Sequence, residues 1–264
     1  YLNRFIRYFR NSEYRQVFVV KAFTDAELFT EYMRNYSGLG IICYTAEYEK
    51  HLLDHNQNFL KLLLSDGYVG DQDSIDNRVL SKLQPLDTLL ATIYSIFLRE
   101  NPYVSSTTAL NRTKTISIQS VTPGFYKNEF SISLSRFLAG EGFKVFYLNL
   151  EQYNASEHFL GAASKFDLSK IIYHLKKDPN KLSAYIERYK SKSSYYNLDY
   201  FERARNVSEL DELEPADINV LLTSIKSLSI YDYLIVECDL TINAQAAFRI
   251  EPSDHLLLLV ENSA

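Results

Sequence analysis

Residues 120–129 (SVTPGFYKNE) combine the residue types and the sequence position that favour phosphate binding. They follow a short apolar run at 114–119 (KTISIQ), which predicts a strand, and precede a helix-like run at 130–139 (FSISLSRFLA). A loop between a strand and a helix binds phosphates with its backbone N–H groups and with the helix N-terminus. Lys127 can add a positive charge, but Gly124 is the one glycine of the segment. The segment therefore predicts a phosphate-binding position that lacks most of its glycines.

This loop, with the strand and helix around it, resembles the deviant Walker A motif of the MinD/ParA family of P-loop ATPases. The family pattern K-G-G-x-G-K-[ST]-[ST] falls on residues 122–129. The resemblance implies that Lys127 matches the lysine that reaches the β- and γ-phosphates, and that Gly124 matches one loop glycine. Asn128 and Glu129 stand at the two hydroxyl positions. These four residues are the expected cofactor-binding positions of a degenerate nucleotide loop.

Five departures from the family pattern each weaken phosphate binding. Thr122 replaces the signature lysine, which in the family reaches the partner's nucleotide across a dimer, and Pro123 removes a backbone N–H. Tyr126 places a side chain where glycine allows close backbone approach. Asn128 replaces the hydroxyl that coordinates Mg²⁺, and Glu129 adds negative charge. Because each charge-assisted bond contributes about 1.5–3 kcal/mol, we expect neither ATP nor Mg²⁺ as a cofactor, and no ATPase activity.

Two later segments also resemble the MinD/ParA family. Residues 142–151 (GFKVFYLNLE) resemble its second strand, and residues 231–239 (YDYLIVECD) resemble its Walker B strand. For an active enzyme, the resemblance implies catalytic roles for Lys127, for Glu151 and for Glu237, which stands at the usual Walker B aspartate position. The alternative hypothesis is therefore a working ATPase that uses these three residues.

The first 100 residues predict a separate α/β unit. Helices are expected at 2–9, 25–36 and 86–99, and strands at 17–23, 39–44, 59–64 and 77–83. This order resembles a response-regulator receiver domain without its first strand. Tyr44 and Thr45 stand where a receiver has its phospho-accepting aspartate, and Gln84 replaces its lysine. We therefore expect a pseudo-receiver that makes contacts and transfers no phosphoryl group.

The whole chain is predicted to be an α/β protein of two domains with parallel sheets. The expected layout is a receiver-like (flavodoxin-like) pseudo-receiver domain at 1–100, a polar linker at 101–113 and a degenerate MinD/ParA-like P-loop NTPase domain at 114–264. Helices are predicted at 168–177, 181–190 and 216–228, and strands at 144–150, 233–238 and 255–260. The last strand resembles the family's next βα unit, so we expect the C-terminal part of this domain to be missing from the sequence.

The order of a pseudo-receiver and a MinD-like domain resembles CpaE-type proteins, which help to position and assemble Tad/Flp pili. The resemblance implies a non-catalytic scaffold or localisation factor with protein partners in pilus or secretion assembly. It also implies a cytoplasmic protein that partners recruit to the inner face of the membrane, and it allows a homodimer. The alternative is an ATP-dependent dimerisation switch of the MinD/ParA type.

Composition excludes several other classes of protein. The chain has 264 residues, of which 46% are hydrophobic and 23% charged, as in soluble globular proteins. A net charge of −5 predicts no nucleic-acid footprint. No apolar run approaches the roughly 18–20 residues of a spanning helix, so no integral membrane segment is expected. Cys43 and Cys238 lie in apolar runs and are expected to be buried free thiols.

Two remaining patterns have a structural and a functional interpretation. His51 and His55 stand four residues apart, which on a helix suits a pair of metal ligands, but no third ligand accompanies them. A solvated helix is favoured, and no metal site is expected. Residues 185–200 mix tyrosine with lysine, which suits either a protein interface or base stacking. The acidic net charge favours the interface.

Overall fold

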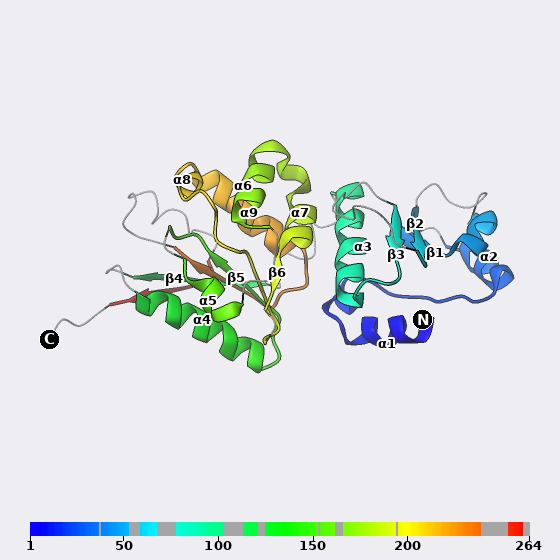
Figure 1. The fold of residues 1–264 in the computed structure, drawn as a ribbon, viewed down its shortest axis with the longest axis horizontal. Helices are drawn as coiled ribbons and strands as arrows, with labels where there is room; N and C mark the ends of the chain where they lie inside the picture. The colour runs from blue at the N-terminus through cyan, green and yellow to red at the C-terminus, as the bar shows by residue number, and fades with distance from the viewer. Residues whose placement is uncertain are drawn as a thin grey trace. The chain divides into compact units, whose positions relative to one another are not determined.

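The computed structural model describes residues 1–36, 38–52, 59–67, 78–102, 113–120, 125–152, 154–161, 166–193, 195–238 and 253–260. The chain forms two compact units, Tyr1–Asn101 and Pro102–Ala264, which Figure 1 shows in blue to cyan and in green to red. Most of the expected linker, residues 103–112, lies outside the described ranges.

The first unit holds a three-stranded parallel sheet of order β1-β2-β3. Asp25 caps helix α2 by accepting hydrogen bonds from the backbone N–H groups of Glu27 and Leu28. The elements in chain order are α1 (Leu2–Asn11), a 3-10 helix (Glu13–Gln16), α2 (Ala26–Arg34), β1 (Gly40–Tyr44), a 3-10 helix (Ala46–Leu52), β2 (Phe59–Ser65), β3 (Val79–Ser81) and α3 (Leu86–Glu100).

The strand expected at 17–23 is wrong. Residues 18–23 belong to no helix or strand, and Val19 is 89% exposed. Phe18 packs edge-on against Tyr94 of α3, while Phe23 packs against Phe29 of α2. The two ends of the segment are therefore held by helices, and β-branched residues make no strand without a neighbour to pair with.

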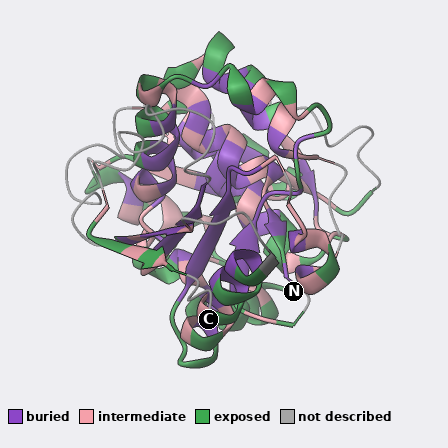
Figure 2. Ribbon diagram, turned by 90° about the vertical axis from the view of Figure 1, so that its left-hand side faces the viewer, coloured by how far each residue is buried: buried purple, intermediate pink, exposed green. Residues whose placement is uncertain are grey.

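The second unit is a six-stranded sheet of order β6-β7-β5-β8-β4-β9, parallel except for the β6–β7 pair. Helices α4 and α5 lie on one face and α6, α7 and α9 on the other, and the central strands are buried (Figures 1 and 2). The elements are β4 (Lys114–Ser120), α4 (Phe125–Gly140), β5 (Val145–Asn149), α5 (Ser156–Leu160), α6 (Leu168–Lys177), a 3-10 helix (Pro179–Lys181), α7 (Leu182–Tyr189), β6 (Ser191–Lys192), β7 (Leu198–Tyr200), α8 (Ser208–Asp211), α9 (Pro215–Ser227), β8 (Tyr233–Glu237) and β9 (His255–Leu259).

A buried group of charges joins the strands of this unit to α7. Asp199 on β7 accepts Lys144 Nζ at 2.8 Å on one carboxylate oxygen and Lys190 Nζ at 2.9 Å on the other. Tyr231 OH donates to Asp199 at 2.7 Å, and Glu187 pairs with Lys190 at 2.9 Å. Burial would raise the pKa of Asp199, but the two lysines outweigh it and hold that pKa well below its usual range. Asp199 is therefore an anion that two buried cations share.

Most tyrosines of the 185–200 segment serve the interior rather than an interface. Tyr189 and Tyr200 are buried, and Tyr185 stacks on His174 of α6 with ring centroids 3.6 Å apart. Tyr195 is 77% exposed. The cysteine expectation also needs a correction, because both thiols are free but Cys43 is exposed.

His174 makes the stability of the second unit depend on pH. Burial and the nearby Lys170 and Lys177 lower the pKa of His174 to about 4. An unfolded histidine takes its proton near pH 6.5, so the folded state loses relative stability as pH falls from about 6.5 toward 4. We expect a loss of about 1–2 kcal/mol between pH 7 and pH 5 that is absent in His174→Phe, which keeps the stack. Denaturant titrations at both pH values measure this difference in unfolding free energy. The control is His158→Gln, a change at an exposed histidine, which should show the same difference as the wild-type protein.

Candidate functional site

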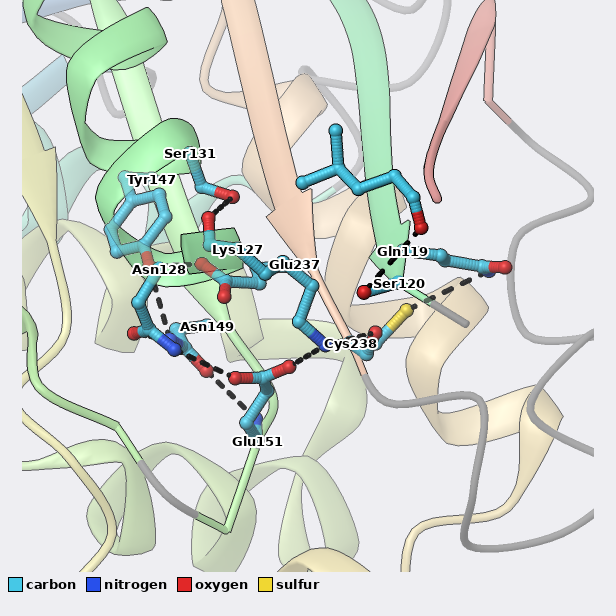
Figure 3. A network of polar contacts seen from close by, with 11 residues as sticks. Gln119, Ser120, Lys127, Asn128, Ser131, Tyr147, Asn149, Glu151, Glu237 and Cys238 are labelled. Carbon is cyan, nitrogen blue, oxygen red and sulfur yellow. Dashed lines mark hydrogen bonds and ion pairs between the residues drawn. The ribbon is translucent and has the colours of Figure 1, made fainter. Parts of the chain in front are cut away.

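Three strands and one helix of the second unit converge on a single edge of its sheet. β4, β5 and β8 end there, and α4 begins there, as expected at the carboxyl edge of a parallel sheet. The segment expected to be a loop as far as residue 129 is helical from Phe125 onward, so Lys127 lies in the first turn of α4. Asn149 on β5 stands directly opposite Glu237 on β8. Figure 3 shows the side chains that meet here.

Lys127 is neutralised inside the protein. Its Nζ forms an ion pair with Glu151 Oε1 and donates a hydrogen bond to the Cys238 carbonyl oxygen at 3.1 Å. The side chains of Lys127 and Glu151 are 3% and 5% exposed. In Figure 3 both point into the space between α4 and the ends of β5 and β8. The Lys127 ammonium is therefore in direct contact with a carboxylate of the same chain.

The second oxygen of Glu151 is held as well. Asn128 Nδ2 donates to Glu151 Oε2 at 2.9 Å. Asn149 supports both residues, because its Nδ2 donates to Asn128 Oδ1 at 3.2 Å and its Oδ1 accepts the Glu151 backbone N–H at 2.8 Å. The same Asn149 amide donates to Tyr147 OH at 3.0 Å. Glu151 is thus fixed by three groups from two elements.

Glu237 forms the inner end of this network. Its side chain is fully buried, and Tyr147 OH donates to Glu237 Oε2 at 2.5 Å. Burial raises the pKa of Glu237, although Tyr147 and Lys127 favour its charged form. Burial and the neighbouring Glu237 raise the pKa of Tyr147 as well. Both groups are therefore biased toward their protonated forms.

Glutamine has the shape of Glu237, and burial disfavours the charged form that glutamine lacks. We therefore expect Glu237→Gln to cost less than about 1 kcal/mol of unfolding free energy, since glutamine still accepts from Tyr147. Glu237→Ala is expected to cost about 2–4 kcal/mol, because it leaves a cavity and a buried phenol without its acceptor. Equilibrium denaturation at pH 7 compares the two. Equal losses in both variants would mean that the site requires an ionised carboxylate.

The structure brings together four of the residues predicted from the sequence: Lys127, Asn128, Glu151 and Glu237. Glu129 is exposed on the outer side of α4, away from them, and Gly124 lies outside the described residues. Tyr147 was not predicted. The sequence could have indicated it, because Tyr147 stands two residues before Asn149 on a predicted strand, and alternate side chains of a strand lie on the same face.

Neither a metal centre nor a membrane span is found in the described ranges. No group of three or more His, Cys, Asp and Glu side chains there could hold a metal ion. His51 lies in a 3-10 helix, and His55 falls outside those ranges. None of the described helices is long and apolar enough to cross a bilayer.

No family model and no curated protein matches this chain. One similar solved structure is a ParA family ATPase from Chlorobium tepidum TLS, with 18% sequence identity over 56% of this chain and 60% of that chain and a TM-score of 0.46. Another is a MinD cell division protein from Aquifex aeolicus, with 18% sequence identity over 55% of this chain and 56% of that chain and a TM-score of 0.44. An ATP complex of a Cyanothece McdA variant is similar at 21% identity, over 56% of each chain, with a TM-score of 0.43.

These neighbours are MinD/ParA-type ATPases. The chain spans 60% of the length of the ParA family ATPase and 56% of the length of MinD.

Proposed function

We propose that this chain is a non-catalytic scaffold or localisation factor that acts through protein–protein contacts. The observation that carries the proposal is the buried pairing of Lys127 with Glu151. By resemblance to CpaE-type proteins, the partners are components of pilus or secretion assembly. The setting proposed is the cytoplasm, with recruitment by those partners to the inner face of the membrane. The first unit acts as a pseudo-receiver.

The energetics of the pair argue against ATP binding. To reach a phosphate, Lys127 must leave Glu151, and separating a buried ion pair costs about 3–5 kcal/mol. That cost is a factor of roughly 100 to 5,000 in affinity, since 1.4 kcal/mol is tenfold. Glu151 would also remain close to the triphosphate and repel it. A site with a dissociation constant of about 1 μM would weaken to about 0.1–5 mM.

The outer side of α4 supports a role in protein contacts. Tyr126, Phe130 and Phe137 are 74%, 40% and 63% exposed. Their spacing of four and seven residues places them along one side of the helix. Aromatic side chains are enriched at protein interfaces.

Calorimetric titration with Mg-ATP tests the proposal directly. We expect no binding in the micromolar range, no ATP hydrolysis and no change in elution volume on size exclusion when nucleotide is added. Lys127→Ala should behave as the parent protein does in all three measurements. Micromolar binding that disappears in Lys127→Ala would overturn the scaffold proposal.

The second candidate is an ATP-dependent dimerisation switch. The convergence of Lys127, Glu151 and Glu237 at one edge of the sheet favours it, because those are the residues that such an enzyme would use. This candidate requires that nucleotide convert monomer to dimer on size exclusion. A change in mass with Mg-ATP, lost in Lys127→Ala, separates it from the scaffold.

A further inference from the structure

We propose that one side of α1, in the first unit, is a docking site for an acidic amphipathic helix of a protein partner. This side, the α1 face, consists of five residues: Asn3, Ile6, Arg7, Arg10 and Asn11. The inference goes beyond the proposed function, because it assigns a binding site to the first unit, whereas the scaffold proposal rests on Lys127 and Glu151 of the second.

α1 carries a positive charge that the rest of the chain does not share. Residues 1–21 contain five basic side chains and one acidic side chain, although the whole chain has a net charge of −5. Arg4, Arg7 and Arg10 are all exposed. The ion pairs between described residues of the first unit involve other cations: Arg78, Lys82 and Arg99. Within the described structure, the arginines of α1 are therefore available to a negatively charged ligand.

The opposite side of α1 is anchored in the first unit. Phe9 is 5% exposed, and it follows Arg7 by two residues, which at about 100° per residue places the two side chains on opposite sides of the helix. The Ser12 hydroxyl donates to the Phe9 carbonyl oxygen at 2.8 Å where the helix ends. Tyr14 is buried and packs edge-on against Tyr94 of α3, with ring centroids 5.7 Å apart. A partner therefore meets a helix that is already ordered, which lowers the entropic cost of binding.

The α1 face borders an open hollow of about 410 Å³. Arg7 and Arg10 are three residues apart, nearly one helical turn, so their guanidinium groups suit two carboxylates on successive turns of another helix. Ile6 is half-buried and lies one turn before Arg10 on the same side, where it offers an apolar contact. The matching ligand is therefore a helix with two acidic residues one turn apart and a leucine-like side chain beside them.

The hollow favours a protein partner over other polyanions. Lipid headgroups and nucleic-acid phosphates attract cations through charge, so they would use Arg4 as much as Arg7 and Arg10. The hollow, however, is lined by Arg7 and Arg10 and not by Arg4. A side chain that projects from a partner helix can enter the hollow and contact Ile6. Arg4 and Ile6 are therefore the residues that distinguish these ligands.

The test is fluorescence anisotropy of the full chain with a labelled helical peptide, at about 0.15 M salt, where charges more than about 8 Å apart are largely screened. The peptide has two glutamates one turn apart and a leucine beside them, and its control has glutamines instead. We expect saturable binding of the glutamate peptide and at least tenfold weaker binding of the control. Arg7→Gln and Arg10→Gln should each weaken binding about tenfold, because each loses a charge-assisted bond.

Arg4→Gln is the matched control, because it removes the same charge from an exposed position of the same helix outside the hollow. It should weaken binding less than threefold, whereas Ile6→Ala should weaken it about fivefold through the lost apolar contact. Circular dichroism and thermal unfolding establish that each variant is folded. The arginine variants alter exposed side chains, so they keep the test valid if Ile6→Ala does not fold.

Two other ligands are measured in parallel: vesicles of equal parts phosphatidylcholine and phosphatidylserine, and a single-stranded oligonucleotide. Tighter binding of either ligand than of the peptide would overturn the assignment to a protein partner, as would equal losses from Arg4→Gln and Arg7→Gln. Absence of saturable binding of the glutamate peptide by the parent protein would overturn the site itself. All of these outcomes leave the scaffold proposal standing, whereas micromolar Mg-ATP binding that is lost in Lys127→Ala overturns that proposal and leaves the α1 site standing.

Discussion

Replacing Asp199 with asparagine will lower the free energy of unfolding of the second unit by about 3–5 kcal/mol. Asp199 is fully buried and is the shared anion of Lys144 and Lys190, whose ammonium groups are 2.8 and 2.9 Å from its two oxygens. Asparagine retains the volume but removes the charge. Two buried ammonium groups then lose the counter-charge that they share, and Tyr231 loses a charged acceptor. Few single changes elsewhere in the described structure should cost as much.

Guanidinium denaturation at pH 7 measures this loss. Asp178→Asn is the matched control in the same unit, because Asp178 pairs with Lys181 at 3.5 Å with both side chains about a third or more exposed. That variant should change the unfolding free energy by less than about 0.5 kcal/mol. The folded pKa of Asp199 lies below its unfolded value near 3.9, so its stabilisation is present at neutral pH and is lost as pH falls below about 4. A small effect of Asp199→Asn at pH 7 would contradict this account.

Lys127→Met will destabilise the second unit by about 2–4 kcal/mol even though no ligand is present. The change removes the cation that pairs with the buried Glu151 carboxylate, and breaking a buried ion pair by removing one partner is strongly destabilising. Glu151→Gln alone should cost a similar amount for the opposite reason. The double variant removes both charges together, so its loss should be smaller than the sum of the single losses by about 1–2 kcal/mol or more.

A double-mutant cycle from denaturant titrations supplies the coupling energy. Glu129→Gln, alone and combined with Lys127→Met, is the control cycle, because Glu129 is an exposed carboxylate two residues from the lysine. Additive losses in that cycle and a clear coupling with Glu151 are the expected result. If Lys127 served only to bind a ligand from solution, its removal would leave stability unchanged or raised, and no coupling with Glu151 would be seen.

Four of the six strands of the second unit could be predicted from sequence, because each is a short apolar run with clear limits. The two- and three-residue strands β6 and β7 were not predicted. The runs at 114–119, 144–150, 233–238 and 255–260 each fall within one residue of the ends of β4, β5, β8 and β9. The order of these strands in the sheet and their register could not be predicted from the apolar runs. The start of α4 was placed too late, because residues 125–129 were expected to turn around a phosphate and instead form its first turn.

The site was predicted as a set of residues but not as a set of bonds. Glu151 and Asn128 stand 23 positions apart, and Lys144 and Asp199 stand 55 apart. Such pairs depend on which strands are neighbours and on how far a side chain reaches, and no local pattern carries that information. The prediction of a strand at 17–23 was wrong for a related reason. Its residues suit a strand, but a strand also needs a partner that local sequence does not reveal.

The position of β4 between β8 and β9 has a consequence for how the chain acquires its structure. The backbone N–H of Thr115 on β4 donates to the side chain of Asp254, 139 residues later, and Ile116 stands beside His255. At about 5–20 residues per second, a ribosome needs roughly 7–30 s to make the chain between them. For most of that time β4 lacks both neighbours, since β8 also lies more than 100 residues away. Folding of the second unit should therefore be slow and must wait until β8 and β9 have been synthesised, and β4 will depend on chaperones more than the helices with short-range contacts do.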